Sequence, residues 1–73
     1  MANLTPARRD VLATLFQSPF PRTAQGMRAR DRVLTALADD GLVQQTTNKH
    51  GMTAWELTDA GRQEASRFVQ AVV

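Results

Sequence analysis

The side chains best suited to chemistry in this chain are arginines, and they are concentrated in one segment. Residues 22–32 contain four arginines against a single aspartate and carry a net charge of +3, whereas residues 39–64, with five acids against two bases, carry −3. A guanidinium forms paired hydrogen bonds with guanine and binds phosphate oxygens. Because the whole chain has a net charge of only +2, the distribution of charge indicates an anionic partner better than the total does.

Catalytic and metal-binding groups are scarce in the sequence. The chain has no cysteine and one histidine, His50, and it lacks both a glycine-rich phosphate loop and a nucleophile-elbow motif. His50 has no second histidine or cysteine with which to share a metal, so we expect an ordinary polar residue of a turn; phosphate binding or a pH-dependent role is the alternative. We therefore expect neither an enzyme nor a metal or cofactor site.

The length of the chain limits the number of domains. Seventy-three residues bury enough apolar surface for one core, so we expect residues 1–73 to form a single domain. No apolar run approaches the roughly 20 residues that cross a bilayer, and the N-terminus lacks the apolar core of a signal peptide. Together with the absence of cysteine, these features favour a cytoplasmic protein without a membrane segment.

Two helical segments are expected within residues 6–27. Thr5 followed by Pro6 predicts the start of a helix over residues 6–17, because proline is well tolerated at the first helical position and threonine caps the helix. Prolines and a serine then end the pattern. Within residues 23–27 there is room for a short helix of one turn or two, with Gly26 as the place where the chain bends.

Periodic apolar residues predict a third helix over residues 28–40, followed by Gly41 in a left-handed C-terminal cap. The face opposite its apolar side carries Arg28, Arg32, Thr35 and Asp39, spaced by four, three and four residues. Arg30 is anomalous because the same helical wheel places it among the apolar residues. Either this helix begins later than residue 28, or the arginine side chain snorkels out at its end.

The second half of the chain predicts a β-hairpin and a last helix. Two β-type runs over residues 43–57 flank a turn at residues 48–51. Trp55 is expected in the core of the domain, although a base-stacking platform is the alternative. Thr58 predicts the N-cap of the last helix. Its apolar stripe, which suits either packing on the first helix or the seam of a homodimer, consists of Ala65, Phe68, Val69 and Val72.

Two local motifs connect these elements to a known family. The run Leu37-Ala38-Asp39-Asp40-Gly41-Leu42-Val43 looks like an LxxxGLV junction between a helix and a strand, and Trp55-Glu56-Leu57-Thr58-Asp59-Ala60-Gly61 is similar to a (Y/W)xLTxxG run. With these motifs and the opening Leu4-Thr5-Pro6, the chain resembles the winged helix-turn-helix domains of bacterial regulators of the MarR and PadR-like groups, over about residues 4–68. The resemblance implies a mainly α fold with a small β-hairpin wing in the order α-α-α-β-β-α.

The resemblance also implies a way of binding double-stranded DNA. In this fold the exposed face of the third helix enters the major groove and the hairpin acts as a wing. The third helix would then read bases, and Lys49 at the hairpin tip would reach a phosphate or the minor groove, although a lysine in a turn is commonly just solvated. The candidate DNA-binding residues are Arg28, Arg30, Arg32, Thr35 and Lys49.

Two functions of different class therefore remain open. The first is a sequence-specific transcriptional regulator of bacterial or phage origin that binds duplex DNA, with its C-terminal helix as the seam of a homodimer. The second is a winged-helix module that binds protein and not DNA, such as a phage or mobile-element factor that occupies a host protein. The modest net charge and the short second helix favour this alternative.

Overall fold

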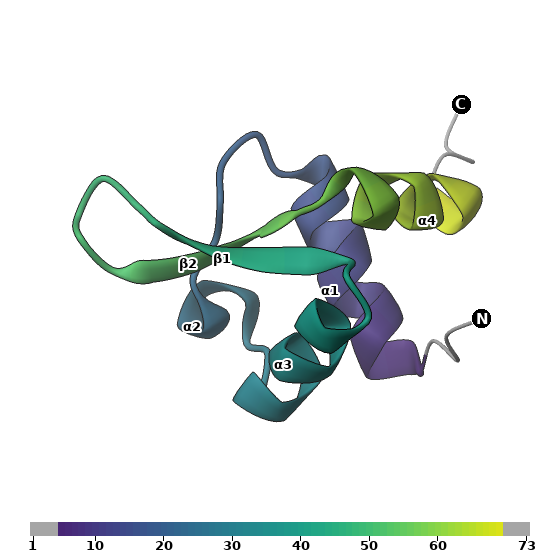
Figure 1. The fold of residues 1–73 in the computed structure, drawn as a ribbon, viewed down its shortest axis with the longest axis horizontal. Coiled ribbons are helices and arrows are strands. Elements are labelled where there is room, and N and C mark those ends of the chain that lie inside the picture. Colours follow the sequence, from purple (N-terminus) through teal and green to yellow (C-terminus); the bar gives the residue numbers. More distant parts are fainter. Residues whose placement is uncertain (1–4, 70–73) are drawn as a thin grey trace.

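The computed structural model describes residues 5–69 and shows four helices around the base of a two-stranded hairpin (Figure 1). The order of elements predicted from the sequence is confirmed: a small mixed domain in which three helices precede the hairpin and one follows it. None of the described helices is long and apolar enough to span a membrane. The elements are α1 (Pro6–Gln17), α2 (Ala24–Met27), α3 (Asp31–Asp39), β1 (Val43–Thr47), β2 (Thr53–Leu57) and α4 (Asp59–Val69).

Helix α1 begins and ends where the sequence predicts. The Thr5 hydroxyl accepts a hydrogen bond from the Arg8 backbone N–H (3.3 Å), and Pro6 occupies the first helical position. Ser18 adopts an extended conformation that ends the helix. The buried face of α1 packs against α3, β2 and α4, so this helix is the centre of the core. Its buried residues are Val11, Leu12 and Leu15.

The bend after α2 lies two residues later than predicted. Gly26 belongs to the single turn of α2, where its N–H donates to the Thr23 hydroxyl (3.0 Å). The chain turns instead at Arg28, which has a φ of 54° and is the sole non-glycine residue with a positive φ within residues 5–69. The Arg28 N–H donates to the Gln25 carbonyl (3.1 Å) and closes the helix in a left-handed cap. The prediction that the chain bends at Gly26 is wrong.

The left-handed residue at Arg28 also corrects the start of the third helix. A residue with positive φ cannot continue into a right-handed helix, and Arg30 is still extended (φ −83°, ψ 146°). Helix α3 therefore begins at Asp31, and of the two explanations for the anomalous Arg30 the later start is confirmed. Arg30 is the N-cap residue and is exposed, so it is not on the apolar side of a helix.

Helix α3 ends in the predicted glycine cap. Gly41 has a φ of 78°, the Leu42 N–H donates to the Leu37 carbonyl (2.9 Å), and the Gly41 N–H donates to the Ala38 carbonyl (2.9 Å). These two bonds make a Schellman motif, and its usual apolar contact is present because both Leu37 and Leu42 are buried. The motif directs the chain from α3 straight into β1.

The predicted hairpin is confirmed, and Trp55 belongs to the core. Strands β1 and β2 pair antiparallel, with Gln45 opposite Trp55. Trp55 is only 7% exposed, so the alternative of an exposed base-stacking platform is wrong. The backbone N–H and C=O of Trp55 both bond to Arg22, whose segment thereby pairs with the free edge of β2 (2.8 and 3.0 Å). Ala54, on the other face of the hairpin, is also fully buried. Both faces of the hairpin base are therefore covered.

The two sequence motifs that carry the family resemblance meet in space. The Thr58 N–H donates to the Leu42 carbonyl (3.0 Å), and the Thr58 hydroxyl donates to the Gly41 carbonyl (2.6 Å). The same hydroxyl accepts from the Gly61 N–H (3.0 Å), which makes Thr58 the predicted N-cap of α4. We call these four residues, Gly41, Leu42, Thr58 and Gly61, the junction. The junction ties the end of α3 and the start of β1 to the end of β2 and the start of α4.

The apolar stripe of α4 packs back on α1. Ala65 is buried, and Phe68 and Val69 are half-buried against the core. The Arg9 guanidinium lies over the Phe68 ring, 4.8 Å from its centroid, in a cation–π contact between the two helices. Val72, the last residue of the predicted stripe, lies outside the described residues. The packing of α4 on α1 is thus present within one chain, whether or not a second copy joins it.

We expect Gly61→Ala to destabilise the fold strongly. A Cβ at this position would overlap the Leu42 carbonyl oxygen, so the junction must open, at a cost of about 2 to 3 kcal/mol in the free energy of unfolding. Without that overlap, the same change in a helix would stabilise it by about 1 kcal/mol. Chemical denaturation measures the difference, with the exposed α4 variant Gln63→Ala as a control expected within about 0.5 kcal/mol of wild type. If Gly61→Ala were more stable than wild type, α4 could not lie as close to the Leu42 carbonyl as the structure places it.

Candidate nucleic-acid interface

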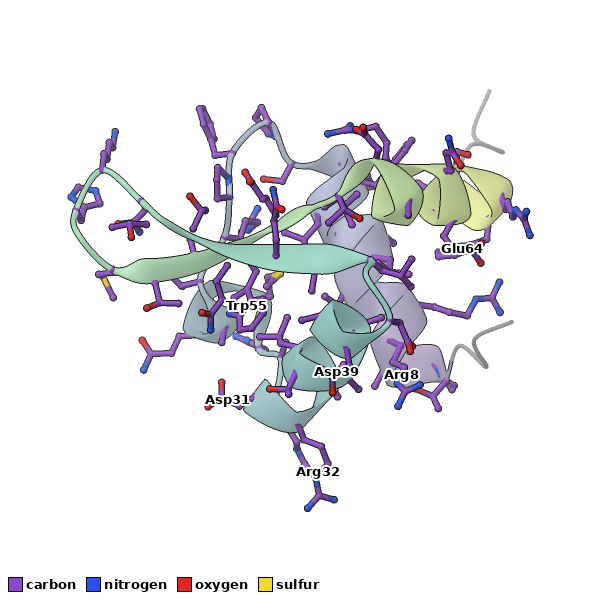
Figure 2. All side chains as sticks on the ribbon, in the orientation of Figure 1. Arg8, Asp31, Arg32, Asp39, Trp55 and Glu64 are labelled. Atoms are coloured by element: carbon purple, nitrogen blue, oxygen red, sulfur yellow. The ribbon has the colours of Figure 1, made fainter. Side chains whose placement is uncertain are left out.

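Helix α3 presents one exposed face that none of the other described elements covers. Leu34 and Leu37 are fully buried on its inner side. Figure 2 shows Arg32 projecting away from the body of the protein, with Asp31 and Asp39 also at the surface of this helix. An arginine can pair with guanine, and a carboxylate can accept from the amino group of cytosine. The exposed residues of α3 are Asp31, Arg32, Thr35 and Asp39.

An arginine cluster surrounds the start of α3. We use this name for Arg28, Arg30 and Arg32, which are all exposed and line one side of a groove whose other wall is α1. Asp10 of α1 also lines the groove, but within residues 5–69 no carboxylate forms an ion pair with any of the three arginines. Unpaired guanidinium groups at a surface are available for an external anion.

The structure changes the role that Arg28 can have. The sequence placed Arg28 one helical turn before Arg32 on a single helix, as a second residue for base contacts. That placement is wrong, because Arg28 lies in the left-handed turn that follows α2. Arg28 and Arg30 therefore flank the helix, and of the candidates on the third helix only Arg32 and Thr35 remain on the exposed face of α3.

The hairpin tip carries the second basic position. Lys49 and His50 are both exposed in the turn, as the sequence predicts. The Asn48 side chain fixes this turn, because its oxygen accepts from the backbone N–H groups of His50 (2.9 Å) and Met52 (3.0 Å). Figure 1 shows that the tip extends beyond the helices, well away from α4. Lys49 is thus presented on a defined turn at the end of a projecting hairpin.

A polar groove between α3 and the hairpin was missed by the sequence analysis. Asp31 and Thr35 line it from α3, and Gln45, Thr53 and Trp55 line it from the two strands. Gln45 pairs opposite Trp55 in the strand register, so both side chains lie on the same face of the hairpin. The alternation of side chains along each strand therefore indicated which residues share a face. Predicting that Gln45 lies beside Trp55 also required the pairing register of the two strands.

The remaining sequence candidates are not brought together into a site. On α1, the Arg9 guanidinium is engaged with the Phe68 ring. His50 lies at the hairpin tip, and across the described part of the chain no group of three or more histidine, cysteine or acidic side chains could hold a metal ion. Among the described residues, the arginine cluster is the group of exposed cations that lies beside the start of α3.

No family model matches the chain, and no curated protein or solved structure matches it either. The family resemblance therefore depends on the two sequence motifs and on the element order, and any function must be argued from the surface itself.

We expect Arg28→Gly to stabilise the protein. Holding a side chain in the left-handed region costs about 1 kcal/mol, which glycine avoids. Arg62→Gly is the control, because it removes the same side chain from an exposed position inside α4; there glycine should destabilise by about 1 kcal/mol, because it adds entropy to the unfolded chain. Thermal unfolding measures both variants. A melting temperature that falls equally in the two would contradict the left-handed turn at Arg28.

Proposed function

We propose that this chain is a winged helix-turn-helix domain that binds double-stranded DNA, with α3 in the major groove and the β1–β2 hairpin as the wing. The element order supports this proposal, and so does the junction formed by the two motifs. The observation that carries it is the arginine cluster: three exposed guanidinium groups with no carboxylate partner in residues 5–69, gathered at the start of a helix with an exposed polar face.

The positions of the basic residues suggest a division of roles. Arg32 and Thr35 lie on the exposed face of α3, so we assign base contacts to them. Arg28 and Arg30 flank the helix, where a duplex whose major groove holds α3 presents its backbone, so we assign phosphate contacts to them. Lys49 would contact the backbone or minor groove beside the wing. The Coulomb repulsion between phosphates and the acids of α3 would disfavour shifted docking positions.

A single recognition helix reads few base pairs, so we propose that the domain acts as a homodimer in a small cytoplasmic regulator of transcription, bacterial or phage in origin. The exposed parts of Phe68 and Val69 line a shallow groove beside α1, which gives a seam through α4. Sedimentation equilibrium measures this association directly.

The proposed roles predict a contrast between two variants in duplex binding. Arg32→Ala should cost about 1 to 3 kcal/mol on a preferred site and relax the sequence preference, because it removes a contact with a base edge. Lys49→Ala should weaken binding to all sequences about equally and lower the salt slope by about one, since it removes a phosphate contact. Fluorescence titrations at several salt concentrations, on a selected site and on random duplex, measure both effects.

Two further variants control for charge and for stability. Arg67→Ala removes a cation that pairs with Glu64 on α4 (3.7 Å) and should leave duplex binding unchanged. Arg28→Gly should weaken binding although it stabilises the fold, so unfolding cannot explain its loss of affinity. If the wild type binds duplex without salt dependence, or if the Arg32, Lys49 and Arg28 variants all bind as it does, the DNA proposal is wrong and a protein-binding module is the better account.

A further inference from the structure

Phe20 is the most exposed large hydrophobic side chain in the described part of the chain. It is 72% exposed, and the next is Met52 at 50%. Phe20 lies in the segment between α1 and α2, away from the exposed face of α3. None of the proposed DNA contacts uses it. Single exposed hydrophobic residues are common on protein surfaces, so the exposure of Phe20 gains meaning only from the segment and the groove around it.

The segment around Phe20 is held in place by its neighbours. Pro19 and Pro21 restrict the backbone on both sides. The Ser18 hydroxyl donates to the Phe20 carbonyl (2.8 Å) and accepts from the Phe20 N–H (3.3 Å). The next residue along, Arg22, makes both of its backbone bonds to Trp55. The aromatic ring is therefore presented on a backbone that has already lost much of its freedom, which lowers the entropic cost of binding.

Phe20 and Pro21 form one wall of a groove, and the hairpin turn forms the other. The opposite wall consists of residues 47–50, which include Lys49 and His50, and the groove has a volume of about 410 Å³. No acidic residue lines it. The groove thus combines an apolar wall with a basic rim, and we call it the Phe20 groove.

The Phe20 groove and the polar groove beside α3 lie on different sides of the hairpin. Figure 1 shows the segment between α1 and α2 rising on one side, with α3 on the other. Thr53 and Trp55 line the groove on the α3 side, whereas Glu56, on the opposite face of β2, lines a hollow with Phe20. A duplex held by α3 would therefore leave Phe20 uncovered, and Lys49, at the hairpin tip, is the residue that the two proposed sites share.

We propose that the Phe20 groove is a docking site for another protein, which binds through a segment that places an apolar side chain against Phe20 and Pro21 and a carboxylate against Lys49. The apolar wall supplies burial, and the basic rim selects an acidic partner. Aromatic residues that become desolvated at the centre of an interface commonly dominate its affinity. This inference does not depend on DNA binding by α3.

The charges disfavour a second copy of this chain as the occupant. The other strongly exposed large hydrophobic residue of the described chain is Met52, which follows the same turn as Lys49. Two copies joined through Phe20 and Met52 would bring their lysines together, and like charges repel. A partner with acidic residues beside its apolar side chain avoids that repulsion.

Selection from a random peptide library displayed on phage, with the immobilised chain as bait, tests the proposal. We expect a consensus in which an aromatic or aliphatic residue adjoins Asp or Glu. A synthetic peptide with that consensus should bind Phe20→Ser about tenfold or more weakly than it binds wild type. Lys49→Ala should also weaken binding relative to wild type, but by a smaller factor, and it should reduce the dependence of binding on salt. Met52→Ser, which removes a comparable exposed hydrophobic residue, should bind like wild type. Circular dichroism shows whether each variant is folded.

Three other outcomes would overturn the proposal. The first is the absence of any consensus, or a consensus peptide that binds Phe20→Ser as tightly as wild type. The second is a loss of duplex affinity in Phe20→Ser, which would make Phe20 a wedge in a DNA groove. The third is a wild-type dimer that Phe20→Ser dissociates in sedimentation, which would make the groove a contact between copies. Because α3 is not involved, failure here leaves the Arg32 and Lys49 contrast in duplex binding intact.

Discussion

The arrangement of this protein depends on one residue, Thr58, and on three of its hydrogen bonds, those with Gly41, Leu42 and Gly61. These bonds hold the turn after α3 against the start of α4, at the base of the hairpin. Because β1 starts directly after that turn and β2 ends directly before Thr58, the direction of the hairpin is fixed relative to the axis of α3. Any ligand that contacts both α3 and the hairpin tip meets a geometry set at this point, where Gly61 permits the close approach.

The sequence predicts correctly those parts of the fold that depend on interactions between neighbouring residues. Thr5 and Pro6 placed the start of α1, and Thr58 placed the start of α4, because a cap acts on backbone groups within one turn. The start of α3 was predicted wrongly for the opposite reason. Arginine is a good helix former, so nothing in its type reveals that Arg28 occupies a left-handed turn, and the nearby Gly26 offered a misleading alternative.

The candidate site divides in the same way. Helical periodicity predicted that Arg32 and Thr35 would be exposed on α3, and the turn at residues 48–51 predicted that Lys49 would lie at the hairpin tip. The groove that includes Gln45 could not be predicted, because it requires the strand register and the position of α3 against it. The place of Phe20 beside the hairpin could not be predicted either, because the segment is attached there by the backbone pairing of Arg22 with Trp55, a contact between distant parts of the chain.

The spacing of the junction also bears on the order in which the chain assembles. Gly41 and Thr58 are 17 residues apart, and most of the intervening chain is the hairpin itself, whereas the packing of α1 on α4 joins the two ends of the described chain. Closing a short loop costs less entropy than closing a long one. We therefore expect α3, the hairpin and the first turn of α4 to form an early folding unit, onto which α1 docks last. The geometry between α3 and the hairpin would then exist before the core is complete.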